Sequence, residues 1–392
     1  MTTPETPVQA NSSSDWSPSS PGLILSLIVL VFIAFFPGLS GGFVNWDDPK
    51  FVLENWIVKD LAWANIQAMF TSYVNGNYGP LTLLSFAFDF HLFGPDPFFF
   101  HLTNLIIHTA NTLLVFWLLQ LLGARPSGSW AGTLLFAVYP LRVESVAWIT
   151  ERKDVLYAFF FLLSLISYLR YRIEGRLFHY ALSLGFCLLS LLTKGLAVTL
   201  PFLLLLCDWY KGKAIDRQTL KTILPFFLLA ILFVIIAIWG QIVSNDLNQH
   251  FTWAFRILVA CWGFLFYLGK TLVPIHLSPF YAFPATTPEG LPWEFHLAPF
   301  GVLGLVILVL LSLKSCRAVV FGFGFFFLAI FPVLQLVPAG PVAAADRFTY
   351  LPAIGLSFLL SLSLDNLIRP SSFRKVLYGS AIVGMLLLSG LI

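Results

Sequence analysis

Two adjacent carboxylates, Asp47 and Asp48, directly follow the first hydrophobic segment of the chain, within the sequence Asn-Trp-Asp-Asp-Pro. Ionisable side chains near hydrocarbon are costly, and they tend to be retained for chemistry, ion handling or pairing. A carboxylate at such a boundary suits a general base, which removes a proton from a reacting group. Asp-Asp-Pro is also good turn chemistry, so a helix cap or a turn is the structural alternative.

A second charged stretch, Tyr139–Asp154, lies between two hydrophobic segments and reads YPLRVESVAWITERKD. If this stretch is helical, Glu144, Trp148 and Glu151 share one face. Its basic side chains have the charge to hold a phosphate, while its acids orient them. A salt-bridge cluster at a helix end is the structural alternative, and both interpretations can hold together. The charged residues of the stretch are Arg142, Glu144, Glu151, Arg152, Lys153 and Asp154.

Two further sites place charge beside apolar segments. Lys194 interrupts a long apolar run. It is either an anchor that reaches the membrane surface or a contact to a phosphate there. Asp346 and Arg347 precede another apolar segment, where they form either part of a site or an interfacial ion pair.

One polar stripe lies within an apolar segment near residues 99–122. Its members recur at spacings of three, four and three, which is a helical period. Hydrogen bonding between helices is its expected use, because two histidines without a third ligand do not make a metal site. The four cysteines are widely spaced, so we expect neither a metal nor a cofactor. The stripe consists of His101, Asn104, His108 and Asn111.

The composition indicates that membrane helices position these residues. Of the 392 residues, 58% are hydrophobic and 10% are charged, and the mean hydropathy is +0.86. Soluble domains carry about 25% charged residues, so the composition excludes a water-soluble protein. The net charge of +3, without a basic arm or patch, argues against a nucleic-acid partner and leaves membrane lipid as the surrounding partner.

Apolar segments of roughly 20 residues predict transmembrane helices. Two such segments separate the basic loop at 211–221 from an outer loop at 274–296, whereas an odd number of spans is needed to change sides of the membrane. Either 255–273 is a re-entrant or interfacial helix, which is the assignment we prefer, or two neighbouring segments are miscounted. The fold class is therefore an all-α polytopic membrane protein with a bundle of about 11 transmembrane helices. The candidate segments lie near 22–39, 99–122, 129–141, 155–171, 177–193, 196–210, 222–243, 255–273, 297–313, 318–338, 349–367 and 376–392.

Lys and Arg in short loops predict the cytoplasmic side of the membrane. The basic loops include 170–176, 211–221 and 369–375, which places both charged stretches on the opposite, outer side. Short basic loops and the lack of a targeting signal favour a bacterial inner membrane, with the site facing the periplasm or outside.

The domain organisation follows from the same pattern. Residues 1–21 are predicted to be a disordered cytoplasmic N-terminus, and 22–392 a membrane domain. The first outer loop, 40–98, is long enough to carry two interfacial helices, one capped by Asp60 and one opened by Pro80.

The order of these features resembles the GT-C superfamily of integral-membrane glycosyltransferases. More specifically, the chain resembles the transmembrane and tetratricopeptide-repeat-containing O-mannosyltransferases and their bacterial relatives. The stretches YPLRVESVAWITERKD and ADRFTYLP are the most specific, and VNWDDPKFVLENWIV and LLTKGLAVTLPFLLLLCDW add to them. The chain departs from this family at Tyr139, where the family commonly has His before Pro140. The family's tetratricopeptide repeats are not in this sequence, which ends inside an apolar segment, and we expect them in a longer product.

The resemblance implies inverting transfer of a sugar, such as mannose, from a polyprenyl-phosphate donor to a protein Ser/Thr or glycan hydroxyl, without a metal or cofactor. An acid of the first outer loop is implied as the general base, which falls on Asp48 or Asp47, with Asp48 preferred. The developing charge on the leaving phosphate needs cations. The residues that fall on these positions are Arg152, Lys194, Arg142 and Arg347, and the acids that would position them are Glu144, Asp154 and Asp346.

Two other functions remain open on the sequence. A transporter or flippase of a polyprenyl-linked or anionic substrate would use the same polar cavity, but we see no internal repeat of the kind that transporters show. A non-catalytic membrane scaffold would need none of these charges, so Asp48→Asn would leave every product unchanged. The position of the Asp pair in an outer loop favours chemistry at the membrane interface.

Overall fold

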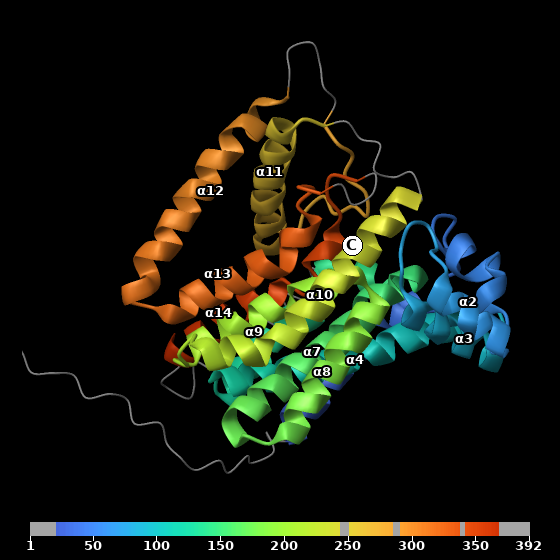
Figure 1. Ribbon diagram of the computed structural model, residues 1–392, viewed down its shortest axis with the longest axis horizontal. Helices are drawn as coiled ribbons and strands as arrows, with labels where there is room; N and C mark the ends of the chain where they lie inside the picture. The colour runs from blue at the N-terminus through green and yellow to red at the C-terminus, as the bar shows by residue number, and fades with distance from the viewer. Residues whose placement is uncertain (1–20, 244–250, 285–290, 338–341, 368–392) are drawn as a thin grey trace, which may run out of the picture.

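The computed structural model describes residues 21–243, 251–284, 291–337 and 342–367. The predicted N-terminal tail and the apolar segment at 376–392 lie outside these residues. Within the described ranges every named element is a helix, and the pairings of strand type are two isolated bridges. Most helices run alongside one another in a bundle, with α2 and α3 of the first outer loop at one end (Figure 1).

The α-helices of the described residues begin and end close to the predicted apolar segments. They are α1 (Pro21–Phe35), α2 (Trp63–Thr71), α3 (Pro80–Phe93), α4 (Pro97–Leu122), α5 (Pro126–Ala137), α6 (Val143–Ala147), α7 (Arg152–Glu174), α8 (Leu177–Thr193), α9 (Leu200–Tyr210), α10 (Arg217–Val243), α11 (Trp253–Leu272), α12 (Trp293–Leu311), α13 (Arg317–Ile330) and α14 (Ala353–Leu367).

Length and composition allow six helices among the described residues to cross a membrane. Five shorter apolar helices accompany them there. α11, which we assigned as re-entrant or interfacial, has 20 residues and is one of the six, so its length does not require that assignment. α5 covers the segment predicted at 129–141 with only 12 residues. The total of about 11 spans therefore stays a prediction.

α7 forms the centre of the bundle, because it packs along both α4 and α8. Small hydroxyl side chains at the contact with α8 let the two backbones approach, and they bond across it. Ser164 Oγ donates to the carbonyl of Ser183 at 2.6 Å, and Ser190 Oγ donates to the carbonyl of Tyr157 at 2.8 Å. The helix that positions the charged stretch is thus held on two sides.

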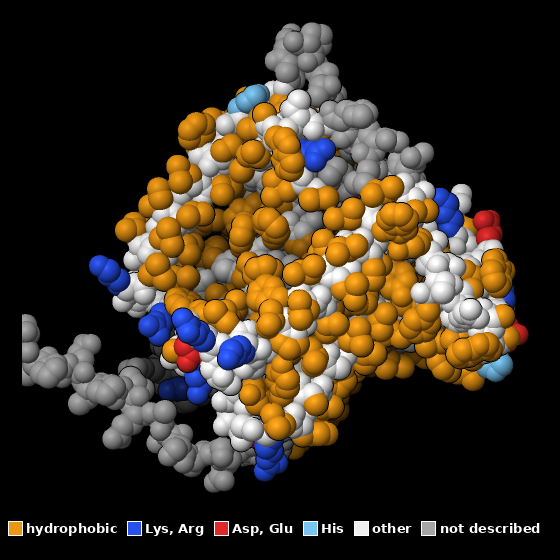
Figure 2. All heavy atoms as spheres, viewed as in Figure 1, with side chains coloured by type: hydrophobic (Ala, Val, Ile, Leu, Met, Phe, Trp, Pro, Cys, Tyr) orange, Lys and Arg blue, Asp and Glu red, His pale blue; other side chains and the backbone are white. Residues whose placement is uncertain are grey.

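The face shown in Figure 2 is largely hydrophobic, as expected for a surface in contact with lipid. Helices α10 and α12 contribute rows of exposed apolar side chains, since few neighbours cover them. These side chains include Leu228, Ile231, Leu232 and Ile235 of α10, and Leu303, Ile307, Leu308 and Leu310 of α12.

The basic loops meet at one end of the bundle. Arg172 Nε donates to Asp208 Oδ1 at 2.8 Å, and its Nη2 donates to Thr219 Oγ1 at 3.4 Å. The Arg317 guanidinium lies 5.8 Å from the centre of the Trp209 ring. Lys and Arg side chains gather at this end, at the lower left of Figure 2. These contacts agree with the assignment of the basic loops to one side of the membrane.

The first outer loop folds onto the bundle as a small helical layer. α2 begins at Trp63 after Ala62, and no side chain caps it, so the prediction that Asp60 is the cap is wrong. Pro80 does occupy the first turn of α3. A buried apolar cluster joins the loop to the bundle, and its members include Phe51, Ile57, Met69, Phe86 and Phe100.

Contact between α3 and α8 fixes the position of this layer. The backbone at Gly79 approaches α8 so closely that a Cβ there would lie 2.7 Å from the carbonyl oxygen of Thr193. The Thr82 hydroxyl donates to the same oxygen at 3.1 Å. α3 is therefore docked on the bundle, in addition to any contact with the membrane surface.

The close contact between α5 and α14 makes Gly132 a sensitive position. A Cβ at Gly132 would overlap the hydroxyl of Ser361 and the carbonyl of Ser357. We predict that Gly132→Ala lowers the free energy of unfolding by about 1–3 kcal/mol, because overpacking forces the helices apart. Thermal unfolding of the purified protein in detergent measures this effect.

Gly185→Ala on α8 is the matched control, since a Cβ at Gly185 meets nothing within 4 Å. We expect this variant to be neutral or more stable by up to about 1 kcal/mol, from helix propensity alone. Equal unfolding temperatures for the two variants would contradict the proposed packing of α5 on α14.

Candidate active site

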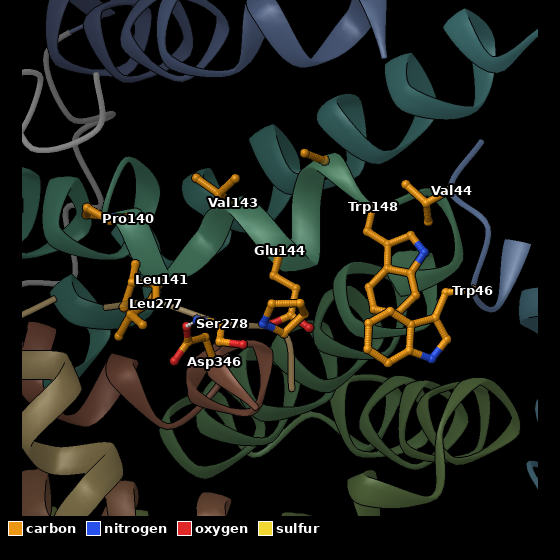
Figure 3. Close-up of a pocket in the computed structure, with 12 residues that line it drawn as sticks. Val44, Trp46, Pro140, Leu141, Val143, Glu144, Trp148, Leu277, Ser278 and Asp346 are labelled. Atoms are coloured by element: carbon orange, nitrogen blue, oxygen red, sulfur yellow. Dashed lines mark hydrogen bonds between the residues drawn. The ribbon is translucent and has the colours of Figure 1, made fainter. Parts of the chain in front are cut away.

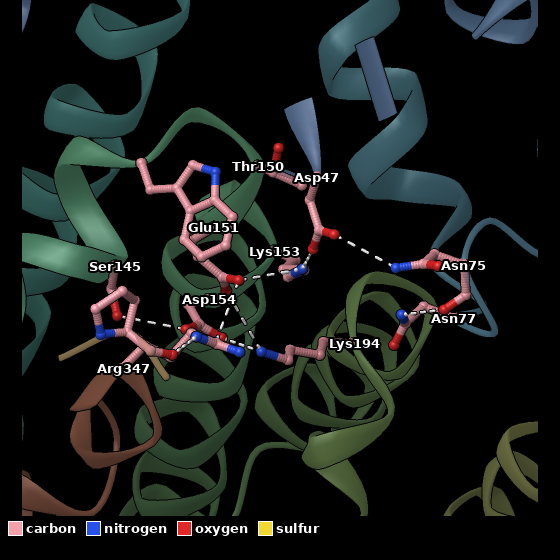
Figure 4. A network of polar contacts seen from close by, with 12 residues as sticks. Asp47, Asn75, Asn77, Ser145, Thr150, Glu151, Lys153, Asp154, Lys194 and Arg347 are labelled. Carbon is pink, nitrogen blue, oxygen red and sulfur yellow. Dashed lines mark hydrogen bonds and ion pairs between the residues drawn. The ribbon is translucent and has the colours of Figure 1, made fainter. Parts of the chain in front are cut away.

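Charged side chains from four separate segments meet at one end of the bundle. α7 begins beside this cluster and ends beside the basic loops, so the two charged regions lie at opposite ends of one helix. The cluster combines the first outer loop, the start of α7, the residue after α8 and the short helix η9 (Asp346–Thr349) (Figure 4). The side chains that these segments contribute are Asp47, Lys153, Lys194 and Arg347, in that order.

Three cations share one buried carboxylate at the centre of the cluster. Glu151 Oε1 lies 3.1 Å from Lys153 Nζ and 3.3 Å from Arg347 Nε, and its Oε2 lies 3.8 Å from Lys194 Nζ. Asp154, also buried, forms an ion pair with Lys194. The Glu151 side chain is 0% exposed, whereas the three cations expose 12–14% of theirs. The accessible side of the cluster therefore presents these cations beside the partly exposed carboxylates of Asp47 and Glu144.

Arg347 is held on several sides. Its Nη1 forms an ion pair with Glu144 and donates to the carbonyl of Pro279 at 3.0 Å, while its backbone N–H donates to Glu144 Oε2 at 2.8 Å. The guanidinium lies 5.6 Å from the ring centre of Trp148 and 4.9 Å from that of Phe348. These contacts fix the orientation of the cation before any ligand binds.

The protonation of this pair follows from its surroundings. Burial lowers the pKa of Arg347, but the carboxylates of Glu151 and Glu144 outweigh that effect and raise the pKa. Burial raises the pKa of Glu144 to about 7, although the opposite charge of Arg347 works against this rise. Arg347 is thus always charged, while Glu144 is a weaker acid than an exposed glutamate.

Asp48 is buried, and protein donors occupy its carboxylate. It accepts hydrogen bonds from Val44 N at 2.8 Å, Trp148 Nε1 at 2.9 Å and Thr150 N at 3.1 Å, and also from the Thr150 hydroxyl. The side chain is 0% exposed. These bonds tie the first outer loop to the charged stretch, which is a structural role other than the helix cap considered for the Asp pair, since the Asp48 side chain caps no helix.

Asp47 lies in a more open environment than its neighbour. It exposes 17% of its side chain and accepts one hydrogen bond at each oxygen, from Asn75 Nδ2 and from Lys153 Nζ, both at 3.3 Å. Each carboxylate oxygen has two acceptor positions, so Asp47 can still accept a proton from a ligand. The sequence led us to prefer Asp48 as the base, whereas the geometry favours Asp47.

Arg152 does not reach the accessible side of the cluster. Its Nε donates to Asn104 Oδ1 at 2.7 Å, and its Nη2 donates to the carbonyl of Phe100 at 2.7 Å. Its Nη1 lies 2.5 Å from Asp89 Oδ2 and donates to the carbonyl of Ser85 at 3.2 Å. This arrangement contradicts the predicted phosphate-binding role, because the N–H groups of the buried guanidinium already bond to groups of the protein and so join α3, α4 and α7.

Arg142 is also fully buried, which does not fit its predicted contact with phosphate. Its Nη2 donates to Thr349 Oγ1 at 2.8 Å, and its guanidinium lies 5.5 Å from the ring centre of Tyr350. Burial lowers the pKa of Arg142 to about 10, with Tyr350 opposing the shift. Arg142 therefore links the two most specific stretches of the sequence and helps to position η9, which carries Arg347.

Asp346 positions a different segment from the one we expected. Its Oδ2 accepts from the backbone N–H of Ser278 at 2.6 Å, and its carboxylate accepts from Tyr281 Oη at 3.2 Å. Burial raises the pKa of Asp346, and the bond from Ser278 opposes this rise. The carboxylate thus holds the loop that follows α11 against η9, instead of orienting the cations.

The charged stretch is not a single helix. Trp148 has an extended backbone, with φ −83° and ψ 122°, between α6 and the short helix Ile149–Glu151. The predicted common face of Glu144, Trp148 and Glu151 is therefore wrong. Glu144 and Glu151 nevertheless converge, because both pair with Arg347 across this break.

His108 and Asn111 of the polar stripe on α4 form hydrogen bonds to neighbouring helices, as predicted. His108 Nδ1 lies 2.6 Å from Tyr350 Oη, and its Nε2 lies 2.8 Å from the carbonyl of Ala137. Asn111 Nδ2 donates to the carbonyl of Val155 at 2.7 Å. Among the described residues, no group of three His, Cys, Asp or Glu side chains has an arrangement that would hold a metal ion.

Sequence reasoning allowed Lys153 to hold a phosphate and Glu151 to orient the cations, but it left both residues out of the site that the family resemblance implies. The signal was present, because opposite charges crowd the first turn of a predicted helix there. Asn75, which donates to Asp47, carried no such signal. It belongs to a turn of the first outer loop whose position depends on the fold.

No family model matches the chain. Curated relatives are nevertheless similar to it over almost its whole length. The protein O-mannosyl-transferase F38B6.6 of Caenorhabditis elegans is 24% identical over 90% of this chain and 54% of its own, and TMTC4 of Mus musculus is 25% identical over 92% and 57%. Tmtc1 of Drosophila melanogaster is 30% identical over 46% of this chain and 22% of its own. The resemblance to this group of O-mannosyltransferases is confirmed.

The chain spans little more than half the length of the relatives that match most of it. Among solved structures, the oligosaccharyltransferase of Archaeoglobus fulgidus, crystallised with zinc and sulfate, covers 94% of this chain and 52% of its own, with a TM-score of 0.51 and 12% identity. This match of folds supports the predicted all-α bundle.

We predict that substitutions of the two adjacent carboxylates change the free energy of unfolding by different amounts. Asp48→Asn replaces an acceptor of several buried hydrogen bonds by a group that also carries donors, so we expect a loss of about 1–3 kcal/mol in the free energy of unfolding. Asp47→Asn keeps an exposed amide, and we expect a change within about 0.5 kcal/mol. Thermal unfolding in detergent compares the two variants. Equal losses would show that the two environments do not differ in this way.

Proposed function

We propose that this chain is the membrane domain of a glycosyltransferase that moves a sugar from a polyprenyl-phosphate donor to an acceptor hydroxyl. The reaction takes place at the cluster of Asp47, Lys153, Lys194 and Arg347, on the side of the membrane opposite the basic loops. Similarity over nine tenths of the chain to proteins named as protein O-mannosyl-transferases supports mannose as the sugar and a protein Ser or Thr as the acceptor.

The observation that carries this proposal is that Asp47, a partly exposed carboxylate, lies beside a group of three cations. Asp47 lies 3.3 Å from Lys153, which shares the buried Glu151 with Lys194 and Arg347. Transfer with inversion needs a base on one side of the anomeric carbon and a stabilised leaving phosphate on the other side. We assign these two tasks to Asp47 and to the cations of the cluster, which other contacts already hold in place.

Each residue has a defined role in the proposed reaction. Asp47 takes the proton of the acceptor hydroxyl while the acceptor oxygen attacks the anomeric carbon. The bond from that carbon to the phosphate oxygen breaks at the same time. Lys194 and Arg347 stabilise the negative charge that develops on the leaving phosphate. Lys153 bridges the two regions, since it contacts both Asp47 and Glu151. Asp48 holds the loop that carries the base.

Sugar transfer to a Ser/Thr peptide from a panel of radiolabelled polyprenyl-phosphate sugars tests this function. We predict that wild-type protein in membranes transfers at least one of these sugars. Asp47→Asn should reduce the rate by about 10²–10⁴-fold, which is the usual contribution of a general base.

Asp60→Asn is the matched control, because Asp60 is an exposed acid of the same outer loop and lies outside the cluster. We expect it to keep wild-type activity. Transfer from none of the donors by the wild type would refute the proposed function. Full activity of Asp47→Asn beside an active wild type would refute only the assignment of the base.

The cations of the cluster lead to a separate prediction about the reaction rate. Lys194→Met should lower kcat by about 10²–10³-fold, because one of the charges that stabilise the leaving phosphate is lost. Lys194→Arg should restore part of the rate, since it keeps the charge. Lys213→Met, which removes an exposed cation of a basic loop, should behave as wild type. Equal rates for Lys194→Met and Lys213→Met would exclude a role for Lys194 in the reaction.

A further inference from the structure

A cavity of about 400 Å³ opens beside the cation cluster and has no role in the reaction as described above. It lies between α6, the first outer loop, the loop after α11 and η9 (Figure 3). The close-up shows the rings of Trp46 and Trp148 next to each other at one side, and Ser278 and Asp346 at the other. Glu144 projects between these two groups.

The charged side chains that line this cavity are acidic, in contrast to the cations of the neighbouring cluster. The lining contains two carboxylates, Glu144 and Asp346, and one hydroxyl side chain, Ser278, but no Lys or Arg. The rest of the lining is apolar. A phosphate would therefore find acids and no cation in the cavity, and like charges at such distances repel. The cavity suits an uncharged ligand with hydroxyl groups, because carboxylates accept hydrogen bonds strongly.

The two tryptophans give the cavity an aromatic wall. Their ring centres lie 5.7 Å apart with the planes tilted by 47°. Trp148 is held by the bond from its Nε1 to Asp48 at 2.9 Å, whereas Trp46 is 50% exposed and its ring packs against those of Trp148 and Phe280. The electron-rich face of an indole attracts the polarised C–H groups of a sugar ring. Aromatic faces combined with a few placed acceptors are therefore a surface for a carbohydrate.

The cavity is connected to both parts of the reaction site. Glu144 lines it and bonds to Arg347, so the proposed phosphate site and the cavity share a wall. Trp46 lines its other side and directly precedes Asp47 in the chain. The sugar of a lipid-phosphate donor is bonded to the phosphate through one oxygen. When the phosphate lies at Arg347, the ring must therefore lie in the adjacent space.

We propose that this cavity binds the glycosyl ring of the donor and that Glu144 and Asp346 select uncharged sugars against uronic acids. This inference rests on the proposed function, since it names a part of the donor. A uronic acid carries a carboxylate at C6 in place of the hydroxymethyl group of the parent hexose. That carboxylate would lie among two protein acids, without a cation of the cavity to pair with it.

Donor binding to the purified protein tests the occupant of the cavity without requiring transfer. The affinities of polyprenyl-phosphate mannose and of bare polyprenyl phosphate are compared in detergent. We expect Trp46→Ala to weaken binding of the sugar-bearing lipid by about 3–10-fold, the range expected for one aromatic contact. Binding of the bare lipid should be unchanged.

Trp56→Ala is the matched control, because Trp56 is an exposed tryptophan of the same loop that does not line the cavity. It should leave both affinities unchanged. Equal affinities of Trp46→Ala and wild type for the sugar-bearing lipid would overturn the proposal. The proposal would also be overturned if Trp46→Ala raised only the KM for the acceptor peptide, because that result would assign the cavity to the acceptor. Both results leave the proposed function intact, whereas lack of transfer by the wild type refutes that function independently of these affinities.

The selection against charge has its own test. Polyprenyl-phosphate glucose and polyprenyl-phosphate glucuronic acid differ only at C6, so the ratio of their affinities isolates the carboxylate. We expect the wild type to prefer glucose by at least about tenfold, and Glu144→Gln to reduce that preference. The glutamine keeps an oxygen that can accept from Arg347, and a ratio is insensitive to a general loss of binding. Equal affinities of the wild type for the two lipids would overturn the selection.

Discussion

The burial of Glu151 is the constraint on which the rest of the site depends. An unpaired carboxylate in this position would cost several kcal/mol, and the cost falls only when cations surround it. Lys153, Lys194 and Arg347 supply these charges from three separate segments of the chain. These three segments must therefore come together at one point. A ligand that reaches the cluster then meets cations that are already positioned, while the acid lies out of reach behind them.

A second buried ion network fixes the layer that carries Asp47. Arg152 bonds to Asp89 of α3 and to Asn104 and the Phe100 carbonyl of α4, so the outer layer and two helices of the bundle form one unit. This explains why Arg152 and Lys153, although adjacent, serve different purposes. Successive residues in the first turn of a helix point about 100° apart. The Arg152 side chain turns toward the interior of the bundle, and the Lys153 side chain turns toward Asp47 and Glu151.

The sequence was sufficient for features that depend on composition and local pattern. Apolar runs located the helices, and the stripe from His101 to Asn111 indicated bonding between helices, because both signals follow from helical periodicity. The sequence could not separate Asp47 from Asp48, or an exposed cation from the buried guanidinium of Arg152. These distinctions depend on donors such as Trp148 and acceptors such as Asp89, which are far away in the chain and become neighbours only in the fold.

The division of work between the two adjacent aspartates connects the base, the cations and the cavity. Asp48 accepts from Thr150 and from Trp148, so it holds the second half of the charged stretch and one wall of the cavity at the same time. Because the carboxylate that performs this task is fully buried, it is not available to a substrate. The neighbouring carboxylate points the other way, toward Lys153, and stays partly open. A pair of acids in the first loop thus allows one residue to position the site and the other to react, which a single aspartate could not do.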